Sequence, residues 1–237
     1  AGLVRMKTGI PLSPYFCAAK MAWILQNRAN AKALAEINTL CLGTMDSYLV
    51  FRLSEEKSFK TDYSNASRTQ LFNIHTLAWD KALCKLFGVP ESCLPEVCMS
   101  DSVFGTTTLG GLFPQPVPIC GVLGDSHAAL LGQNCRRPGE IKATYGTGSS
   151  VMMQTGTQPV NSSGGLVTSL AWGLNGQVSY VLEGNLNYTG AVITWLKEDV
   201  SLIASASESE RLARQANPMD KTYFVPAFTG LGAPYWD

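Results

Sequence analysis

The sequence lacks an excess of charge of either sign. Its 237 residues include 18 lysines and arginines against 18 aspartates and glutamates, so the formal net charge at pH 7 is zero. No stretch approaches the five or six like charges that are typical of tails binding nucleic acids or anionic membranes, and the most basic stretch is only Arg136-Arg137. We therefore expect neither a nucleic-acid partner nor a membrane partner.

The chain also has no long apolar run and no closely paired cysteines. No window reaches the roughly 18 apolar residues of a membrane span, and the first residues lack the apolar core of a signal peptide. With only two histidines and no CxxC pair, neither a zinc site nor a disulfide framework is indicated. The sequence therefore predicts a cytoplasmic protein with reduced thiols and no metal-binding residue cluster. Its seven cysteines are Cys17, Cys41, Cys84, Cys93, Cys98, Cys120 and Cys135.

Three common catalytic signatures are missing as well. The absence of GxxxxGK[ST] excludes a P-loop, the absence of GxGxxG excludes a Rossmann dinucleotide site, and the absence of GxSxG excludes a hydrolase nucleophile elbow. With 46% hydrophobic residues, the chain can still bury a sizeable core in one large domain or two modest ones. What it offers instead of these motifs is an acidic strand-to-helix junction and a glycine-rich turn.

The apolar pattern changes character near Pro116, and the polar connection 134–139 is the candidate domain boundary. Before this point it predicts mainly helices, and after the polar connection 134–139 it predicts mainly strands. Asn175-Gly176 is a typical two-residue turn of a β-hairpin. Helices are expected at residues 14–37, 45–53, 80–87, 126–133 and 189–197, and strands at 117–123, 140–145, 150–154, 165–172, 178–183 and 222–227.

Asp125 is the sharpest catalytic candidate. It follows a strand that we expect to be buried and precedes a helix, which is the position where substrate crevices form in α/β proteins. A carboxylate held there could act as a general base toward a substrate hydroxyl. The alternative is an N-cap aspartate that binds the amides of its own helix. Neighbouring positions on a helix point in different directions, so we expect His127 to be structural rather than a partner of Asp125.

The turn Gly146-Thr147-Gly148 is the second candidate. Its glycines let backbone N–H groups approach an anion closely, and the neighbouring Ser149 and Ser150 add hydroxyl donors. The turn is therefore a candidate phosphate cradle. The alternative is a glycine-rich hairpin that binds no anion.

Taken together, these segments resemble the FGGY carbohydrate kinases, and within them the glycerol kinases. The resemblance covers nearly the whole chain and includes several runs long enough to be specific. The runs that carry it are Thr8–Pro11 with Pro14–Phe16, Lys20–Leu25, Gly43–Asp46, Thr61–Thr69, Leu71–Leu77, Leu94–Val97, Gly124-Asp125, Ala128–Leu130, Thr144–Gly148, Leu182–Gly184 and Phe224–Asp237.

This resemblance implies an α/β enzyme of the actin-like ATPase (ribonuclease H-like) fold, of which the chain holds parts of two domains. Residues 1–134 would belong to the substrate domain and residues 135–237 to the nucleotide domain. ATP and a polyol or sugar would meet in the cleft between them. By matching positions, Asp125 corresponds to the family's catalytic base and Tyr15 to a residue that contacts the substrate hydroxyls.

On the nucleotide side, the resemblance implies contacts from Thr147 and Gly190, with Gly146 and Gly148 beside them in the turn. Magnesium would accompany the ATP, because phosphoryl transfer depends on positioning and charge neutralisation. The family's first phosphate-binding strand pair and its adenine-binding segment have no counterpart in the sequence. We therefore expect an internal fragment of a longer enzyme, inactive alone.

Two departures from the glycerol kinases concern the substrate pocket. Ser126 stands where a glutamine is usual after the base, and Ser150 stands where an aromatic wall is usual. A smaller and more polar wall makes a substrate larger than glycerol credible. The expected activity is phosphorylation of glycerol or a related polyol, with a ketopentose such as xylulose as the runner-up. A noncatalytic fragment that serves as a binding or structural module is the alternative from another class, and self-association stays open.

Overall fold

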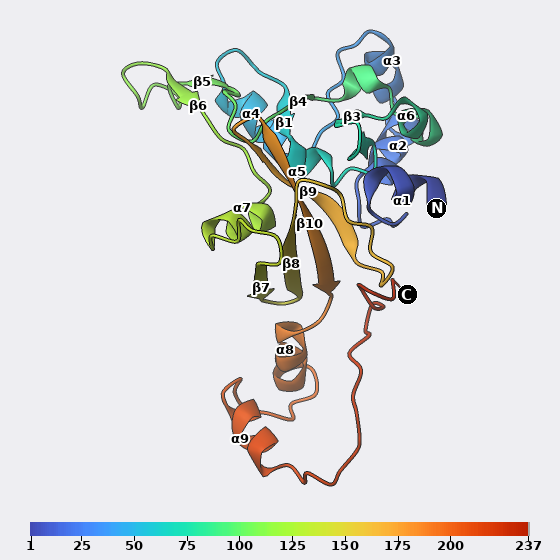
Figure 1. Ribbon diagram of the computed structural model, residues 1–237, viewed down its shortest axis with the longest axis vertical. Coiled ribbons are helices and arrows are strands. Elements are labelled where there is room, and N and C mark those ends of the chain that lie inside the picture. The colour runs from blue at the N-terminus through green and yellow to red at the C-terminus, as the bar shows by residue number, and fades with distance from the viewer. Residues whose placement is uncertain (237) are drawn as a thin grey trace.

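The computed structural model describes residues 1–236 of the chain. Its centre is a four-stranded antiparallel sheet in the order β7-β8-β10-β9. Apart from α7, which lies beside β7 and β8, the helices of the first part of the chain gather at one end of β9 and β10, and α8 and α9 lie beyond the other end (Figure 1). The strands of this sheet are β7 (Ile141–Tyr145), β8 (Ser149–Gly156), β9 (Val167–Leu174) and β10 (Gln177–Leu186).

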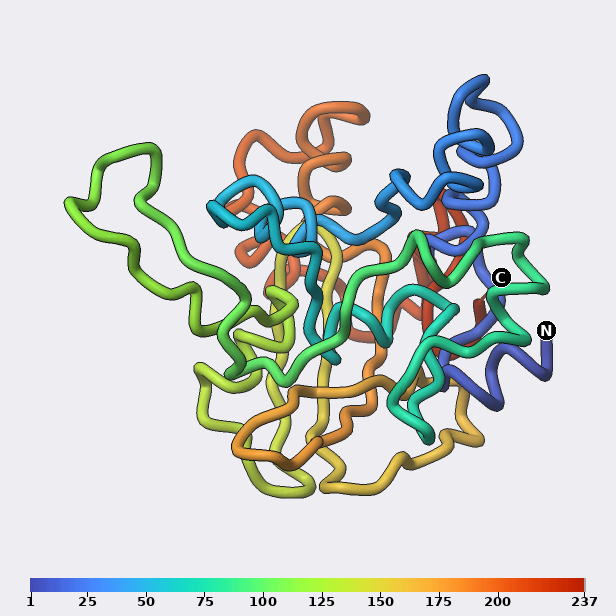
Figure 2. Tube along the Cα trace, turned by 90° about the horizontal axis from the view of Figure 1, so that it is seen from above, coloured from blue at the N-terminus to red at the C-terminus, as the bar shows by residue number. Residues whose placement is uncertain are grey.

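The first part of the chain is mainly helical, as the apolar pattern predicts. Its strands form three short two-stranded pieces, β1-β4, β2-β3 and β5-β6, and the β5-β6 ribbon projects from the body in both views (Figure 1, Figure 2). The elements are α1 (Gly2–Thr8), α2 (Ala18–Asn27), α3 (Ala31–Glu36), α4 (Met45–Leu53), β1 (Lys60–Asp62), α5 (Tyr63–Ala66), β2 (Phe72–Asn73), β3 (Ala78–Trp79), α6 (Lys81–Phe87), a 3-10 turn at Glu91–Cys93, β4 (Glu96–Cys98), β5 (Gly105–Thr107), β6 (Val117–Ile119) and α7 (Asp125–Gly132).

Beyond the sheet, the chain forms α8 (Gly190–Glu198) and α9 (Glu208–Gln215). Within residues 1–236, no helix combines the length and the apolar composition that crossing a bilayer requires. The same residues contain no disulfide, and the seven cysteines are free thiols.

The β9–β10 hairpin is confirmed by the structure. Asn175 and Gly176 both have positive φ, 52° and 76°, which is the conformation of the two-residue turn that the dipeptide predicts. β9 is buried along nearly its whole length because both of its faces are covered. Leu170 packs in a core with residues of the first part of the chain, and Ala171 packs in a core with α7.

The two parts of the chain share one of these cores. Leu170 and Tyr180 from the sheet pack against Ala66, Phe72 and Ile74 from the first part. The Tyr180 hydroxyl donates to the Ile74 carbonyl at 2.7 Å. The sheet is therefore fixed to the helical part by buried contacts as well as by the connecting chain.

The helix expected over residues 14–37 is two helices. α2 ends at Asn27, and Arg28 takes an extended conformation with φ −100° and ψ 118° before α3 begins. Asparagines at 27 and 30 compete for backbone hydrogen bonds with their side chains, and the Asn27 amide donates to the Trp23 carbonyl at 2.8 Å. The apolar spacing continued across this break, so periodicity alone could not locate it.

The strand expected to be buried at residues 117–123 is shorter and more exposed than predicted. Only Val117–Ile119 is a strand, and it pairs with β5 in the projecting ribbon. Pro118 has no N–H to donate to a ladder, and Gly121 and Gly124 favour irregular backbone. The loop before Asp125 is held instead by two hydrogen bonds, from the Val122 amide to the Ser100 carbonyl and from the Gly124 amide to the Ser64 hydroxyl.

The C-terminal end differs from the expectation at residues 222–227 and holds a helix that the sequence analysis did not predict. Residues 222–227 form no strand, although they are rich in β-formers, because no strand of the described chain pairs with them. The serine-rich segment runs into the unexpected helix α9, which carries ion pairs at helical spacing. These pairs join Arg211 to Glu208 and Arg214 to Glu210.

A fully buried carboxylate, Asp62, organises the junction between the two parts. It accepts hydrogen bonds from the Ser64 amide and hydroxyl, the Asn65 amide and side chain, and the Ser100 hydroxyl. The Ser100 hydroxyl also accepts from the Gly173 amide of β9 at 3.0 Å. One side chain thus caps α5 and connects it to β9.

We expect the substitution Asp62→Asn to lower the free energy of unfolding by about 3 kcal/mol, because an NH2 group would replace one carboxylate oxygen and leave the buried donors that face it without an acceptor. Urea unfolding of the wild-type and variant chains measures this difference. Glu96→Gln is the matched control. Glu96 lies exposed on β4, and its ion pair with Lys60, at 4.0 Å, contributes little to stability. Equal losses in both variants would contradict the role assigned to Asp62.

Candidate functional site

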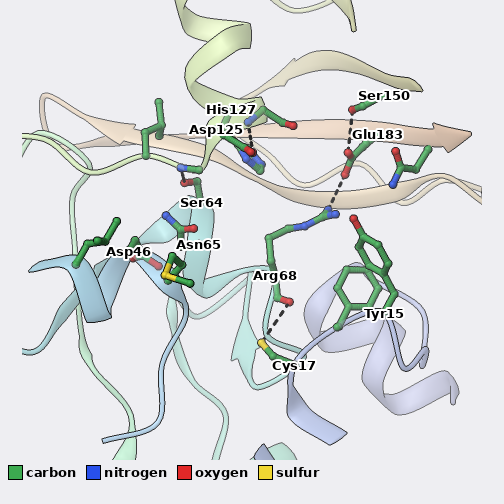
Figure 3. Close-up of a pocket in the computed structure, with 17 residues that line it drawn as sticks. Tyr15, Cys17, Asp46, Ser64, Asn65, Arg68, Asp125, His127, Ser150 and Glu183 are labelled. Carbon is green, nitrogen blue, oxygen red and sulfur yellow. Dashed lines mark hydrogen bonds and ion pairs between the residues drawn. The ribbon is translucent and has the colours of Figure 1, made fainter. Parts of the chain in front are cut away.

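A cavity of about 610 Å³ opens between the first part of the chain and the sheet. Figure 3 shows its walls, which come from the segment before α2, the start of α4, α5, the start of α7, β8 and β10. The cavity therefore lies at the junction of the two parts of the chain. The lining residues are Tyr15, Phe16, Cys17, Met45, Asp46, Leu49, Ser64, Asn65, Arg68, Leu123, Gly124, Asp125, Ser126, His127, Ser150, Glu183 and Asn185.

Asp125 is the first residue of α7, and its side chain is exposed to the cavity. Its Oδ1 accepts from the Ser126 amide at 2.6 Å. The N-cap position is occupied by Gly124, so Asp125 is not the N-cap residue, although its carboxylate accepts from this one amide of its own helix. The backbone is fixed just before it, because the Gly124 amide donates to Ser64 Oγ at 2.8 Å. The result is a solvated carboxylate on a rigid support.

His127 is buried in the wall behind Asp125. Burial lowers its pKa to about 3, with the Arg68 and Lys142 cations contributing and the Asp125 carboxylate opposing the shift. Its Nε2 lies 3.4 Å from the Ser169 hydroxyl. The ring is therefore neutral and packed near pH 7, which agrees with the structural role that we expected.

An ion pair crosses the cavity between the two parts of the chain. Arg68 Nη1 lies 2.7 Å from Glu183 Oε2, and the Ser150 hydroxyl donates to Glu183 Oε1 at 3.0 Å (Figure 3). The Arg68 guanidinium also lies over the Phe16 ring, 5.2 Å from its centroid. Arg68 comes from the segment after α5 and Glu183 from β10, so this pair joins the helical part to the sheet.

Sequence reasoning missed Arg68 and Glu183 as parts of the site. Both stand in runs that carry the family resemblance, Thr61–Thr69 and Leu182–Gly184, and these runs were the available signal. Nothing in either run indicates that the other lies opposite to it. That pairing depends on how the sheet packs against the helical part.

Asp46 is a second carboxylate that the sequence did not single out. It accepts from Thr44 Oγ1 at 2.5 Å and from Thr61 Oγ1 at 2.6 Å. Burial raises its pKa, and the two threonine hydrogen bonds oppose that effect. Its oxygens are engaged by the protein, which distinguishes it from Asp125.

The four residues expected to bind the substrate all line this one cavity. They come from distant parts of the chain: Tyr15, Asp125, Ser126 and Ser150. Tyr15 is exposed and stands edge-on to Phe16, with ring centroids 5.2 Å apart. Ser150 faces the cavity from β8, with its hydroxyl tied to Glu183. The structure thus brings the four residues named in the sequence analysis together in one cavity.

The residues expected to bind the nucleotide form a separate group beside the cavity. The β7–β8 turn, Gly146–Gly148, lies against the start of α8, where the Gly190 amide donates to the Gly146 carbonyl and the Ala191 amide to the Thr147 carbonyl. A Cβ at Gly190 would come within 2.6 Å of the Gly146 oxygen, so this close approach requires glycine. Within residues 1–236, the structure records no hydrogen-bond partner for the amides of Thr147 and Gly148.

The side chains of the described residues form no group of three histidines, cysteines, aspartates or glutamates that could hold a metal ion. A magnesium ion that arrives on ATP needs only one or two carboxylates in addition to the phosphates. The cavity is lined by three carboxylates, Asp46, Asp125 and Glu183. Of these, Asp46 and Glu183 are bonded to protein side chains, and Asp125 is the most exposed. The residues therefore fit a metal that is brought by the nucleotide.

Two protein-family models match the chain. The N-terminal domain of the FGGY family of carbohydrate kinases matches residues 2–132, and the C-terminal domain of the same family matches residues 141–237. Among curated relatives, the glycerol kinase of Lactobacillus acidophilus is 46% identical over 237 residues and that of Bacillus cytotoxicus is 50% identical over 235 residues. The alignments cover 100% and 99% of this chain but 47% of each relative. The chain thus spans about half the length of these relatives.

Solved structures show the same likeness. A glycerol kinase of Plasmodium falciparum, solved with ADP, superposes with a TM-score of 0.88 at 35% identity, over 99% of this chain and 47% of that one. A xylulose kinase of Lactobacillus acidophilus superposes with a TM-score of 0.80 at 22% identity, over 100% of this chain and 47% of that one, and shows the fold alone. The fold is the actin-like ATPase fold of these kinases, represented by parts of two domains.

The neutral, buried His127 gives a testable pH dependence of stability. Its folded pKa lies below its unfolded value, so the unfolded chain takes up the proton first as the pH falls below about 6.5. The stabilisation is complete above pH 6.5 and is lost progressively toward pH 3. Because of His127, we expect the free energy of unfolding to be about 2 kcal/mol lower at pH 4.5 than at pH 7.

Urea unfolding of the wild type and of His127→Asn at pH 7 and pH 4.5 measures this cost. The variant should lose less free energy of unfolding between the two pH values, because it has no ring to protonate. Comparing the two proteins removes the contributions of the carboxylates, including the raised pKa of Asp46, which acts in the opposite direction. The same acid loss in both proteins would show that His127 is not buried in its neutral form.

Proposed function

The chain belongs to the FGGY family of carbohydrate kinases, and from this premise we propose that its protein transfers the γ-phosphoryl group of ATP to a hydroxyl of glycerol or a related polyol. The observation that carries the proposal is the exposed carboxylate of Asp125, held on a rigid loop in a cavity at the junction of the two parts. Tyr15, Ser126 and Ser150 line the same cavity and supply hydroxyl groups for a polyhydroxy substrate.

In the proposed reaction, Asp125 accepts the proton of the substrate hydroxyl. The hydroxyl oxygen forms a bond to the γ-phosphorus, the bond from that phosphorus to the β–γ bridging oxygen breaks, and ADP leaves. The barrier is lowered chiefly by alignment and by neutralisation of the phosphate charge. The carboxylate suits the role of base because it is exposed on the cavity wall and accepts only the Ser126 amide among the described residues.

ATP is proposed to bind at the β7–β8 turn and the start of α8. The Thr147 and Gly148 amides are available to phosphate oxygens, and Gly146 and Gly190 allow the turn to approach the helix closely. Magnesium would be carried in with the nucleotide and would neutralise charge on its phosphates. The relative solved with ADP supports this proposal by analogy.

We also propose which part of the chain belongs to the substrate domain and which to the nucleotide domain. Residues 1–134 would form part of the substrate domain and residues 135–237 part of the nucleotide domain. The two family models support this division, because one ends at residue 132 and the other begins at residue 141.

A cytoplasmic location and a polyol or sugar as the substrate that accepts the phosphoryl group belong to the same proposal. The free thiols of all seven cysteines support a reducing compartment. Self-association is proposed from exposed apolar side chains of α2 and α3, among them Trp23 and Leu34.

The substitution Asp125→Asn tests the base. It keeps the size of the side chain and a hydrogen bond but removes the basicity, so we expect kcat to fall by about 10²–10⁴-fold. ATP affinity should change little, because the proposed nucleotide contacts lie on the other wall. Single-turnover kinetics and ATP titration of the complete protein measure both effects. Near-normal phosphoryl transfer would remove Asp125 from the mechanism, and lost ATP binding would reassign it to the nucleotide site.

The substitution Ser150→Phe tests substrate size. An aromatic ring would fill space on the cavity wall that now admits a longer substrate, so preference should shift toward glycerol by up to about 10–200-fold in kcat/KM. Ratios of kcat/KM for glycerol, erythritol and xylulose in the complete protein measure the shift. Ser150→Ala is the matched control, because it removes the bond to Glu183 without adding volume. Unchanged ratios in Ser150→Phe would show that this wall does not select the substrate.

A further inference from the structure

The ion pair between Arg68 and Glu183 has no role in the reaction proposed above, although it lies in the cavity wall. Its side chains are 21% and 7% exposed, so water and salt screen the pair little. A pair of this kind is weak evidence for stability, because apolar side chains of similar volume often stabilise a fold as well or better. Its place in a cavity wall therefore indicates a role in the site.

Arg68 is held from a second direction by an aromatic ring. Its guanidinium lies over the Phe16 ring, 5.2 Å from the centroid. Phe16 is 3% exposed and packs with Ile10 and with Val167 of β9, so the ring is itself fixed. Tyr15 stands edge-on to Phe16, with the ring planes at 86°. The guanidinium is thus one ring away from Tyr15, which is proposed to contact the substrate hydroxyls.

Glu183 holds the opposite wall through its second oxygen. Its Oε2 contacts Arg68, and its Oε1 accepts from the Ser150 hydroxyl at 3.0 Å. Figure 3 shows Tyr15 on one side of the ion pair and Ser150 on the other. A continuous set of contacts therefore joins a proposed substrate contact of the first part of the chain to one of the sheet.

These contacts determine the spacing of the two walls before a substrate binds. A planar guanidinium can pair with a carboxylate and lie over a ring at the same time, which a lysine ammonium does less well. Preorganised walls matter for the rate, because a displacement of about 1 Å can cost on the order of 10²-fold. They matter for selectivity too, because walls with a fixed spacing distinguish substrates that differ by one carbon.

We propose that Arg68 and Glu183 are a positioning pair for the polyol: the ion pair fixes the distance between the Tyr15 wall and the Ser150 wall, and so aligns the reacting hydroxyl with Asp125 and selects polyols by length. The inference rests on the proposed function, because it takes a polyol as the substrate and Asp125 as the base. It assigns neither Arg68 nor Glu183 a contact with the phosphoryl group.

The test is a double-mutant cycle of Arg68→Gln and Glu183→Gln in the complete protein that carries this chain. Each single variant should lower kcat/KM for the preferred polyol by about 10–100-fold, mainly through a higher KM. The double variant should lose no more than the worse single variant, because the second substitution finds no pair left to break. ATP affinity should stay unchanged, because the proposed nucleotide contacts lie at the β7–β8 turn and α8.

The double variant also separates positioning from folding. Its melting temperature should stay close to that of the wild type, because both charges are removed together. The kcat/KM values for glycerol, erythritol and xylulose should move toward one another, because the walls are no longer held. Wild-type values and ratios in a double variant that melts like the wild type would overturn the proposal. Losses that multiply across the two single variants would overturn it as well, because the residues would then act separately.

A second variant keeps the test decisive if the double variant does not fold. Glu183→Asp retains the charge and shortens the side chain by one methylene, so one carboxylate can no longer meet both Arg68 and Ser150. We expect a higher KM for the preferred polyol and a smaller spread of kcat/KM among the three substrates. Wild-type KM and ratios in Glu183→Asp would overturn the proposal.

Arg28→Gln is the matched control for the loss of a cation that lies over a ring. The Arg28 guanidinium lies 5.5 Å from the centroid of the Trp23 ring, and the residue is exposed and outside the cavity. This variant should leave kcat, KM and the melting temperature unchanged. An equal rise in KM in Arg28→Gln would overturn the proposal, because the effect would not depend on the cavity.

Failure of this inference can be told apart from failure of the proposed function. If the wild-type protein phosphorylates a polyol and the variants of the pair do so with the same KM and the same selectivity, the role of the pair is wrong and the proposed function stands. If the wild-type protein phosphorylates none of glycerol, erythritol and xylulose, the proposed function fails, and the inference fails with it.

Discussion

The arrangement of the site depends on the buried carboxylate of Asp62. A carboxylate without water is stable only when many donors surround it, and here the donors come from α5 and from the loop around Ser100. The Ser64 hydroxyl donates to Asp62 and accepts from the Gly124 amide, so the loop that carries Asp125 is fixed to the same centre. The exposed carboxylate of Asp125 is thus positioned by a buried acid that it never touches.

The same centre determines how the two parts of the chain meet. Through Ser100, Asp62 is connected to Gly173 on β9, and a Cβ at Gly173 would come within 2.7 Å of the Tyr63 ring. The close approach of β9 to α5 therefore requires glycine at that point. It is this approach that brings β10 near enough for Glu183 to meet Arg68. The packing around Asp62 and the ion pair between Arg68 and Glu183 therefore depend on the same interface between α5 and β9.

Much of this could be predicted from local sequence, and the failures have physical causes. Asp80 and Asn175-Gly176 determine a helix start and a hairpin turn through their own side chains and backbone, so α6 and the β9–β10 hairpin were predicted. The strand before Asp125 was predicted too long because Pro118 limits pairing in a way that apolar content does not reveal. Asp125 itself was found from its place between strand-like and helical patterns. The pairing of Arg68 with Glu183 was not found, because it depends on contacts between residues far apart in sequence.

The charges of the cavity wall show why the two parts of the chain have to be considered together. The first part contributes Arg68, Asp46 and Asp125, and the sheet contributes Glu183, so the ion pair between Arg68 and Glu183 needs both parts. Separating the two parts would leave Glu183 without Arg68 and would expose the core that Tyr180 shares with Ile74. Burial keeps the charged side chains few in number and fixed in position. The electrostatic potential of the wall therefore changes strongly when one of them gains or loses a proton. A single exposed carboxylate can therefore alter the net charge of the wall while the backbone around it stays in place.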